Sequence, residues 1–434
     1  MLAEPTPQPR TLPHRLCAVN GRLRGGRLDR FAPPLVFSAS LVLLIGYAAA
    51  SGRLLGPPRN PDGVAYDAIG VGLAEGHGFA AATDSPTFRD PYVVAGRGNE
   101  LPPPRPPQTT AMRPPVLPMM LAAVHRLGSH YVLIRLLAAV AVAGSTAIAA
   151  GWVRDRCGLL PALTLLPALA LVADYRTREM SRVVLTEPFA LLLVTAAADR
   201  LVAAFDRRRL HDAWAAGVLL GLAGLMRTAV VLWIPPLAVL LLAFCGVRSR
   251  RVTAAAVVAA LVVVSPWMIR NAVVTGSPAV LGTQGSIELP AGYSDAAWLR
   301  RGRWHQDSRP PLTAATLVEE VAAADEGRRL ATDWIAANPL RASLLAPLKV
   351  IDELGPHAHG DVALWLLALV GWVAVVRDPL RPVSVAILLS CLVAVAATWS
   401  VGGRFLWPTA SLLHAVAACG LWHGLTTGHS DTAD

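Results

Sequence analysis

Two acidic residues have the type and the setting for catalysis, and the first is Asp62. It begins the segment DGVAYD, which ends at Asp67 and follows Pro61. If this segment is helical, Asp62 and Tyr66 lie one turn apart on the same face, and Pro61 suits the first turn. Because residues 68–73 are apolar, we expect a short amphipathic helix on the outer membrane surface. The alternative role of Asp62 is that of a helix-capping carboxylate.

The second acid is Glu187, in the sequence Thr186-Glu187-Pro188 at the start of an apolar run. An acid in the first turn of a helix is stabilised by the helix dipole. We expect Glu187 to face Asp62 across the outer surface, so that two carboxylates share one site. Such a pair can bind a divalent cation or act as a base and an orienting group.

Arginines occur in outer turns, where the positive-inside bias predicts few. A guanidinium at the membrane surface pairs readily with phosphate in a bidentate fashion. Several arginines converging at one leaflet therefore indicate a site for an anionic lipid head, most simply a phosphate or diphosphate. The alternative is salt bridging with Asp174, Glu179 and Glu187. The arginines in these outer positions are Arg176, Arg178, Arg182, Arg227, Arg270 and Arg404.

Arg113 is followed by Pro114 and Pro115 at the start of another apolar stretch. The two prolines stiffen the chain where it re-enters the membrane, which puts Arg113 at the depth of the lipid headgroups. The alternative is an interfacial arginine that snorkels toward water.

The elements that must position these residues are membrane-spanning helices. The chain has 434 residues, 54% of them hydrophobic and only 16% charged, with a mean hydropathy of +0.48. Several apolar runs reach the roughly 20 residues that cross a bilayer, and the short alternating strands of a β-barrel do not occur. The sequence therefore predicts an all-α polytopic membrane protein.

The net charge of +10 does not indicate nucleic-acid binding. The basic residues lie in short turns between apolar runs, as membrane topology requires, and no basic stretch is interleaved with aromatic residues. The five cysteines show neither metal-ligand spacing nor a disulfide framework.

We expect about ten transmembrane helices, and the basic turns between them set the orientation. The Arg-rich tail and the turns that alternate with the outer ones place both termini in the cytoplasm, and we expect a multi-pass protein of the plasma membrane. Residues 116–127 are expected to form a shallow helix. The predicted spans are about 34–55, 131–152, 158–174, 184–204, 212–226, 228–247, 252–268, 361–376, 382–400 and 405–425.

The domain organisation follows from these spans. A cytoplasmic basic tail covers 1–33, and an N-terminal transmembrane module covers 34–268, with a long catalytic first outer loop at 51–130. The remaining parts are an extracytoplasmic loop with short helices at 269–360, C-terminal transmembrane helices at 361–425 and a tail at 426–434.

Several motifs in this order resemble the GT-C glycosyltransferases of the family 39 type, which include protein O-mannosyltransferases and lipid A aminoarabinose transferases. The likeness runs from Asp62 to about Leu421. Toward the N-terminus the motifs are D-x-x-x-Y at Asp62 and Tyr66, GHGF at 76–79, and R-P-P at Arg113 with Arg135 in the next span. Further along the chain they are the acid of Thr186-Glu187-Pro188, GLAGLMRT around Arg227, P-W-x-x-R-N ending at Arg270-Asn271, and G-R-F at Arg404. Two departures are Thr228 in place of a proline and Gly63 in place of a second acid.

The resemblance implies transfer of a sugar, with inversion, from a polyprenyl-phosphate donor to an envelope glycan, lipid or protein acceptor on the outer face. It implies that Asp62 is the catalytic residue, as the general base or the acceptor-orienting carboxylate, with Glu187, Tyr66 and Asp67 orienting the acceptor or a metal. A divalent cation, if one is used, would lie between Asp62 and Glu187. The implied donor-phosphate ligands are Arg113, Arg135, Arg182, Arg227, Arg270 and Arg404.

Two other function classes compete with this interpretation. A lipid-linked saccharide flippase or polymerase also needs outer arginines, but it needs no acid in the first loop. Another polytopic transporter predicts charged residues at mid-membrane and broken helices, whereas the ionisable residues here cluster at helix ends.

Overall fold

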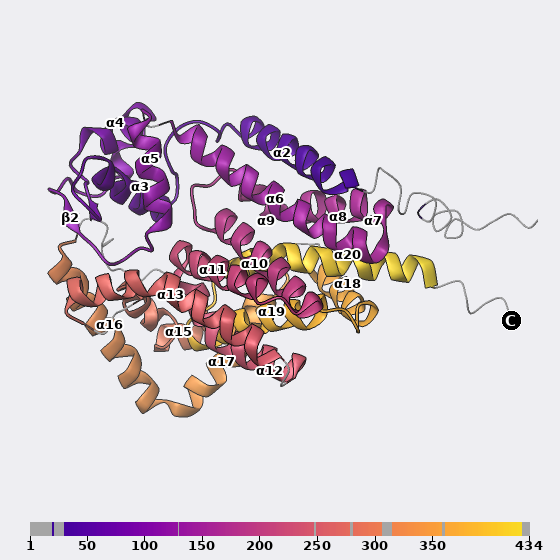
Figure 1. Cartoon of the computed structure of the whole chain (residues 1–434). Helices are drawn as coiled ribbons and strands as arrows, with labels where there is room; N and C mark the ends of the chain where they lie inside the picture. The colour runs from indigo at the N-terminus through magenta and orange to yellow at the C-terminus, as the bar shows by residue number, and fades with distance from the viewer. Residues whose placement is uncertain are drawn as a thin grey trace, which may run out of the picture.

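The protein is described by a computed structural model, which covers residues 20, 30–128, 130–246, 249–277, 281–305, 315–357 and 361–427. Most of the expected tails at 1–33 and 426–434 lies outside these residues. The described chain is a helical bundle whose helices run roughly side by side, with a cap of shorter elements at one end (Figure 1).

In the described part of the chain, seven helices are long and apolar enough to cross a membrane, by length and composition. They are Ala32–Ala50 (α2), Tyr131–Cys157 (α6), Glu187–Arg207 (α10), Thr228–Cys245 (η4 Thr228–Trp233 with α12 Ile234–Cys245), Arg250–Thr275 (α13), Leu380–Ala397 (α19) and Arg404–Thr426 (η8 Arg404–Thr409 with α20 Ala410–Thr427). Large apolar side chains on them, such as Val42 and Val262, are exposed, as on helices that face lipid. The predicted helical, multi-pass membrane protein is confirmed.

Four shorter apolar helices fill the remaining predicted positions. They are Val116–Arg126 (α5), Leu159–Ala173, Leu210–Met226 (α11) and Asp361–Ala374 (α18). The stretch 159–173 is divided into α7 (Leu159–Leu163), α8 (Leu165–Pro167) and η3 (Ala168–Ala173), and Pro161 and Pro167 explain why it is not one regular helix. The count of ten spans stays a prediction.

Small residues allow the helices to approach closely. At the contact of α18 with α20, a methyl group added to Gly371 would meet the carbonyl oxygen of Val416, and one added to Gly420 would meet that of Leu367. Close backbone approach through glycine is typical of helix pairs in membranes. The core that results is continuous from α6 and α10 through α19 and α20.

The cap is built from the two long segments that were predicted to face outside. The first contains α3 (Pro61–Ala74), β1 (Ala80–Ala81), α4 (Pro86–Val94), η2 (Gly98–Glu100) and β2 (Gln108–Thr109). The second contains α14 (Gln284–Glu288), η6 (Leu289–Ala291), α15 (Asp295–Leu299), α16 (Leu317–Ala337) and α17 (Pro339–Leu354). Helix α9 (Tyr175–Glu179) precedes α10. The antiparallel pair β1–β2 is a small addition to the predicted all-helical class.

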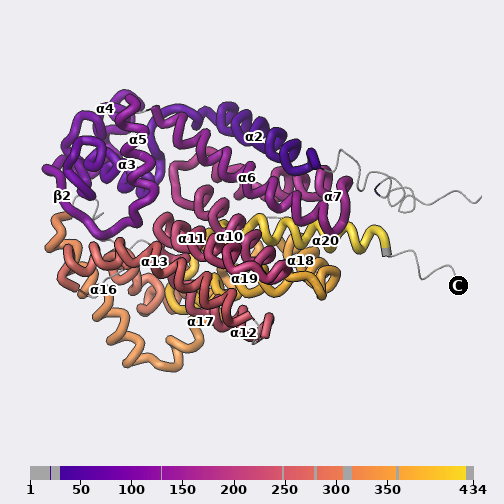
Figure 2. The backbone as a smooth tube through the Cα atoms, viewed as in Figure 1, coloured from indigo at the N-terminus to yellow at the C-terminus, as the bar shows by residue number. Residues whose placement is uncertain are grey.

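The two segments lie at the same end of the bundle, where Figure 2 shows α3, α4 and α5 near α16. Glu320 of α16 joins them. Its carboxylate accepts hydrogen bonds from the Thr110 hydroxyl (2.6 Å), the Ala111 main-chain nitrogen (2.9 Å) and the Thr283 hydroxyl (2.5 Å). The cap is therefore one packed unit and not two separate loops.

Helix α3 differs from its expected setting. Every residue from Gly63 to Gly72 is buried, so the predicted amphipathic surface helix is wrong. The helix packs on α5 and β1, and the addition of a methyl group at Gly72 would meet the carbonyl oxygen of Ala80. The cap supplies apolar partners on all sides, so the apolar residues of α3 need no membrane surface.

Candidate active site

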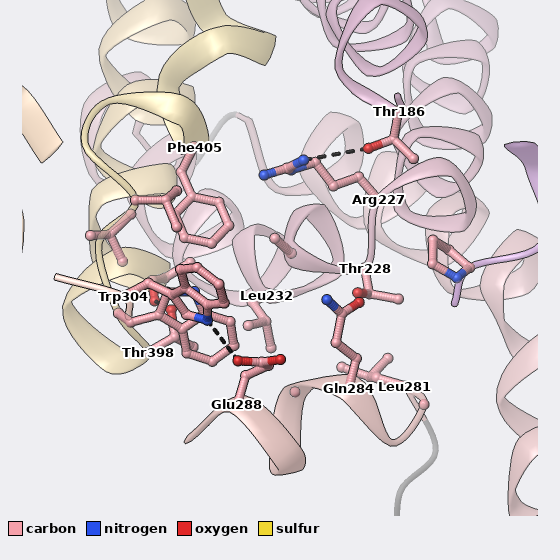
Figure 3. A pocket seen from close by; sticks show the side chains of 18 of the residues that line it. Thr186, Arg227, Thr228, Leu232, Leu281, Gln284, Glu288, Trp304, Thr398 and Phe405 are labelled. Atoms are coloured by element: carbon pink, nitrogen blue, oxygen red, sulfur yellow. Dashed lines mark hydrogen bonds between the residues drawn. The ribbon is translucent and has the colours of Figure 1, made fainter. Parts of the chain in front are cut away.

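A cavity of about 500 Å³ lies between the cap and the bundle. Its walls come from the start of α3, the chain before α5, the start of α10, η4, α14 and the end of α19 with the turn that follows. Figure 3 shows Arg227 and Thr186 on one side, Gln284, Leu281 and Glu288 on another, and Trp304 with Phe405 on a third. The cavity therefore has polar groups on two sides and an aromatic wall on the third.

Asp62 faces this cavity from the first turn of α3. The N-cap of that helix is Asn60, whose side chain accepts from the Gly63 nitrogen, and Pro61 occupies the first position. Because Asn60 caps the helix, the Asp62 carboxylate is available for other partners. It accepts from Arg113 Nη2 at 2.9 Å and from Arg404 Nη2 at 3.1 Å. Asp62 and Tyr66 both line the cavity, as their spacing on one helical face predicts.

Glu187 is fully buried at the start of α10. Its carboxylate accepts from Arg227 Nη1 at 2.8 Å and from Arg404 Nε. Arg404 thus joins the two acids, although they come from distant parts of the chain. The salt bridges that were the alternative to a phosphate site are present at Glu187, which pairs with Arg227 and with Arg404. Both arginines nevertheless line the cavity.

The electrostatics of the site favour a charged Asp62. Burial by itself raises the pKa of the Asp62 carboxyl, but the nearby Arg113 and Arg404 outweigh it and hold that pKa well below its ordinary value. Burial raises the pKa of the Tyr66 hydroxyl, so Tyr66 remains a neutral donor. The Arg113 guanidinium stacks over the Tyr66 ring, 5.2 Å from its centre, which fixes its direction toward Asp62.

A divalent cation does not fit this arrangement of the two acids. The Arg404 guanidinium bonds to both carboxylates, and Arg113 and Arg227 add further positive charge beside them. A metal would have to displace these ion pairs. Among the described residues, no group of three or more His, Cys, Asp or Glu side chains gathers as a metal site.

The structure places Asp67 away from the cavity. Its carboxylate is fully buried and accepts from Tyr92 Oη at 2.9 Å and Tyr131 Oη at 2.7 Å, with His125 Nε2 at 2.8 Å. These partners belong to α4, α6 and α5. Asp67 therefore ties the first outer segment to the bundle.

Three of the six predicted phosphate ligands also lie outside this cavity. Arg135 and Arg182 line a different cavity. Arg270 donates to the Thr110 carbonyl at 2.8 Å, and its guanidinium lies over the rings of Phe79 and Trp267. Arg113, Arg227 and Arg404 are the three that the structure brings together with Asp62.

Sequence reasoning missed the aromatic half of the cavity. Trp304 donates from Nε1 to Glu288 at 2.6 Å, and Phe405 lies 5.1 Å below the Arg227 guanidinium. Trp399 completes this wall. The only sequence signal was position: Phe405 follows Arg404 in the late motif, and Glu288 lies in the polar stretch after Arg270.

Comparisons with known proteins bear on part of the chain. The family model described as dolichyl-phosphate-mannose-protein mannosyltransferase matches residues 112–269. The match confirms the predicted resemblance over that range, which includes Arg113, Glu187 and Arg227 and leaves out Asp62 and Arg404. No curated protein matches the chain.

Two solved structures are similar in outline. One is the archaeal oligosaccharyltransferase AglB from Archaeoglobus fulgidus, in complex with an inhibitory peptide and a dolichol-phosphate, at 12% identity and a TM-score of 0.49 over 91% of this chain. This chain covers 50% of that protein, about half its length. The other is ArnT from Cupriavidus metallidurans bound to undecaprenyl phosphate, at 14% identity and a TM-score of 0.41, covering 90% of this chain and 77% of that one.

Proposed function

We propose that this protein is a membrane glycosyltransferase that moves a sugar from a polyprenyl-phosphate donor to an acceptor bound at the cavity, with inversion. The observation that carries the proposal is the meeting of Asp62 with Arg113 and Arg404 in a cavity of about 500 Å³. Arginines at a phosphate stabilise the negative charge that develops on a leaving group, and a carboxylate beside them accepts a proton.

In the proposed reaction the acceptor hydroxyl attacks the anomeric carbon and gives its proton to Asp62. The bond between that carbon and the phosphate oxygen breaks, and the electron pair leaves with the polyprenyl phosphate. One displacement by one base inverts the anomeric centre. Arg227 and Arg404 hold the departing phosphate, and the aromatic wall with Trp304 gives the sugar an apolar face to pack on.

Arg404, which helps to lower the pKa of Asp62, is also a proposed ligand of the donor phosphate, so donor binding changes that pKa. Arg404 is shared between Asp62 and Glu187, so a bound phosphate competes for it. Loss of that partner and the arrival of negative charge both raise the pKa of Asp62. The carboxylate therefore becomes a better proton acceptor when the donor is in place.

We place the protein in the plasma membrane with both termini in the cytoplasm and the cavity on the outer face. The acceptor in this proposal is an envelope glycan, lipid or protein. The basic turns at the end of the bundle opposite the cap support this orientation.

The test is Asp62→Asn in the full chain, assayed for sugar transfer from a radiolabelled polyprenyl-phosphate sugar in membranes. We expect transfer to fall by about 100- to 10,000-fold, because general-base catalysis contributes about that much. The matched control is Asp90→Asn, an exposed aspartate of α4 in the same outer segment. Full transfer by the Asp62 variant at equal protein level would exclude Asp62 as the base.

A further inference from the structure

A second cavity, of about 280 Å³, lies beside the candidate active site. Four arginines line it: Arg53 and Arg59 from the chain between α2 and α3, Arg135 from α6, and Arg182 from the turn before α10. The cavity shares no lining residue with the active-site cavity. The two cavities are adjacent, because Asn60 lines one and Asp62 lines the other.

Arg135 lines this cavity and has no carboxylate partner among the residues that the structure describes. The residue is only 3% exposed. Its guanidinium donates to the main-chain carbonyl of Gly56 at 2.8 Å and, at 3.4 Å each, to those of Leu54, Pro57 and Arg182. Carbonyl oxygens orient a guanidinium, but they leave its positive charge uncancelled.

The other three arginines have few carboxylate partners to neutralise their charge. Arg182 pairs with Glu179, whose carboxylate also accepts from the Tyr47 hydroxyl at 2.8 Å. The buried Arg182 Nε has no hydrogen-bond partner among the described residues. Within the described part of the chain, Arg53 and Arg59 form no ion pair with a carboxylate. Among the described residues, only one carboxylate, that of Glu179, therefore pairs with any of the four arginines that line this cavity.

This excess of positive charge favours the binding of an anion. Guanidinium groups match the oxygens of phosphate by geometry and by charge. A water molecule occupies roughly 30 Å³ in the liquid, so the cavity has room for a phosphate group with several waters. Leu55, beside the arginines, is 73% exposed, and the end of α2 and the start of α6 border the cavity. These features are typical of the depth of lipid headgroups.

We propose that this cavity is a second anion site, which binds the phosphate group of an anionic lipid or free inorganic phosphate. It is distinct from the phosphate position proposed beside Asp62 and does not rest on the proposed glycosyl transfer. The two predicted ligands Arg135 and Arg182 belong to this second site.

The test compares three forms of the full chain, purified in a nonionic detergent. The double variant Arg53→Gln/Arg59→Gln removes two charges from the cavity while sparing the buried Arg135. The matched control is Arg126→Gln/Arg300→Gln, which removes two exposed arginines elsewhere in the cap. Native mass spectrometry measures binding of phosphatidylglycerol and, separately, of inorganic phosphate. Equal melting temperatures of the three forms establish that each is folded.

We expect the wild type and the control to bind phosphatidylglycerol with the same affinity, and the double variant to lose one bound lipid or to bind it at least about tenfold more weakly. Competition by inorganic phosphate would show that the phosphate group is what the site holds. If the binding of inorganic phosphate depends on Arg53 and Arg59 and the binding of phosphatidylglycerol does not, the site is assigned to the free ion. Equal binding of both probes by all three forms would overturn the proposal.

Discussion

At the scale of single residues, the active-site cavity has one positive charge in excess. Asp62 and Glu187 face Arg113, Arg227 and Arg404. A phosphate that enters the site supplies the missing negative charge. Glu187 is a buried carboxylate, which needs charged partners, and it has two, Arg227 and Arg404.

A buried lysine gives a residue-scale prediction about pH. Lys349 is the only lysine. Its Nζ has no hydrogen-bond partner among the described residues and lies 3.5 Å from the centre of the Tyr293 ring. Burial lowers its pKa from 10.5 to about 7. Between these two pH values the folded state therefore binds fewer protons than the unfolded state. The contribution of Lys349 to the free energy of unfolding rises with pH across that window.

We expect Lys349→Met to raise the apparent melting temperature at pH 7, where the destabilisation caused by the buried ammonium group is close to its maximum. The gain shrinks toward pH 10, because the unfolded lysine also loses its proton there. The measurement is thermal unfolding of the detergent-solubilised chain at several pH values. Arg341→Met, an exposed position of the same helix, is the control. A gain that does not change with pH would contradict the prediction.

At the scale of elements, helix α17 holds the turn that carries Arg404. The Glu353 carboxylate accepts from the main-chain nitrogens of Phe405 (2.6 Å) and Val401 (3.0 Å) and from the Ser400 hydroxyl (2.9 Å). Between these anchors the chain passes through Gly402 and Gly403, both with positive φ (64° and 84°), a conformation that glycine adopts without strain.

We predict that Glu353→Gln displaces Arg404 and weakens donor use. Hydrogen bonds to a charged group are worth about 1.5–3 kcal/mol, which corresponds to a fall of about 10- to 100-fold in kcat/KM for the donor. The acceptor KM should change much less, because Arg404 faces the phosphate in the proposed reaction. The measurement is steady-state transfer with each substrate varied in turn.

The control for this element is Glu326→Gln, an exposed acid on α16. It should leave both constants unchanged. A Glu353 variant that raises donor and acceptor KM equally would mean that α17 supports the cap as a whole and does not position Arg404.

At the scale of the whole molecule, charge and hydropathy divide the protein into two ends. The two long segments form the cap at one end (Figure 1), and residues of the first segment line both cavities. The other end carries the Arg-rich turns, among them the link between α10 and α11 at 207–209. By the positive-inside bias we propose that this second end faces the cytoplasm.

Cysteine labelling tests that orientation. In a variant without the five native cysteines, Ser343→Cys in α17 and Arg209→Cys between α10 and α11 provide two exposed positions. We expect a membrane-impermeant maleimide to label the Ser343 position in intact cells and the Arg209 position only after permeabilisation. The reverse pattern would invert the proposed topology and place the cavity in the cytoplasm.

The sequence by itself determined the helical class, most helix positions and the pairing of Asp62 with Tyr66 on one face. These features are local, because a run of apolar residues or a spacing of four residues fixes them without reference to the rest of the chain. The resemblance added the motif order, and it pointed to Asp62, Glu187 and the arginines as a group.

Only the tertiary structure decided which of those residues meet. Arg404 reaches Asp62 across 342 positions of sequence, whereas Arg135 and Arg182 turn toward another cavity and Asp67 enters a buried network. The burial of α3 was also beyond sequence reasoning, because it depends on the cap that covers it. Such contacts depend on how the helices pack, and spacing along the chain carries no information about which distant helices become neighbours.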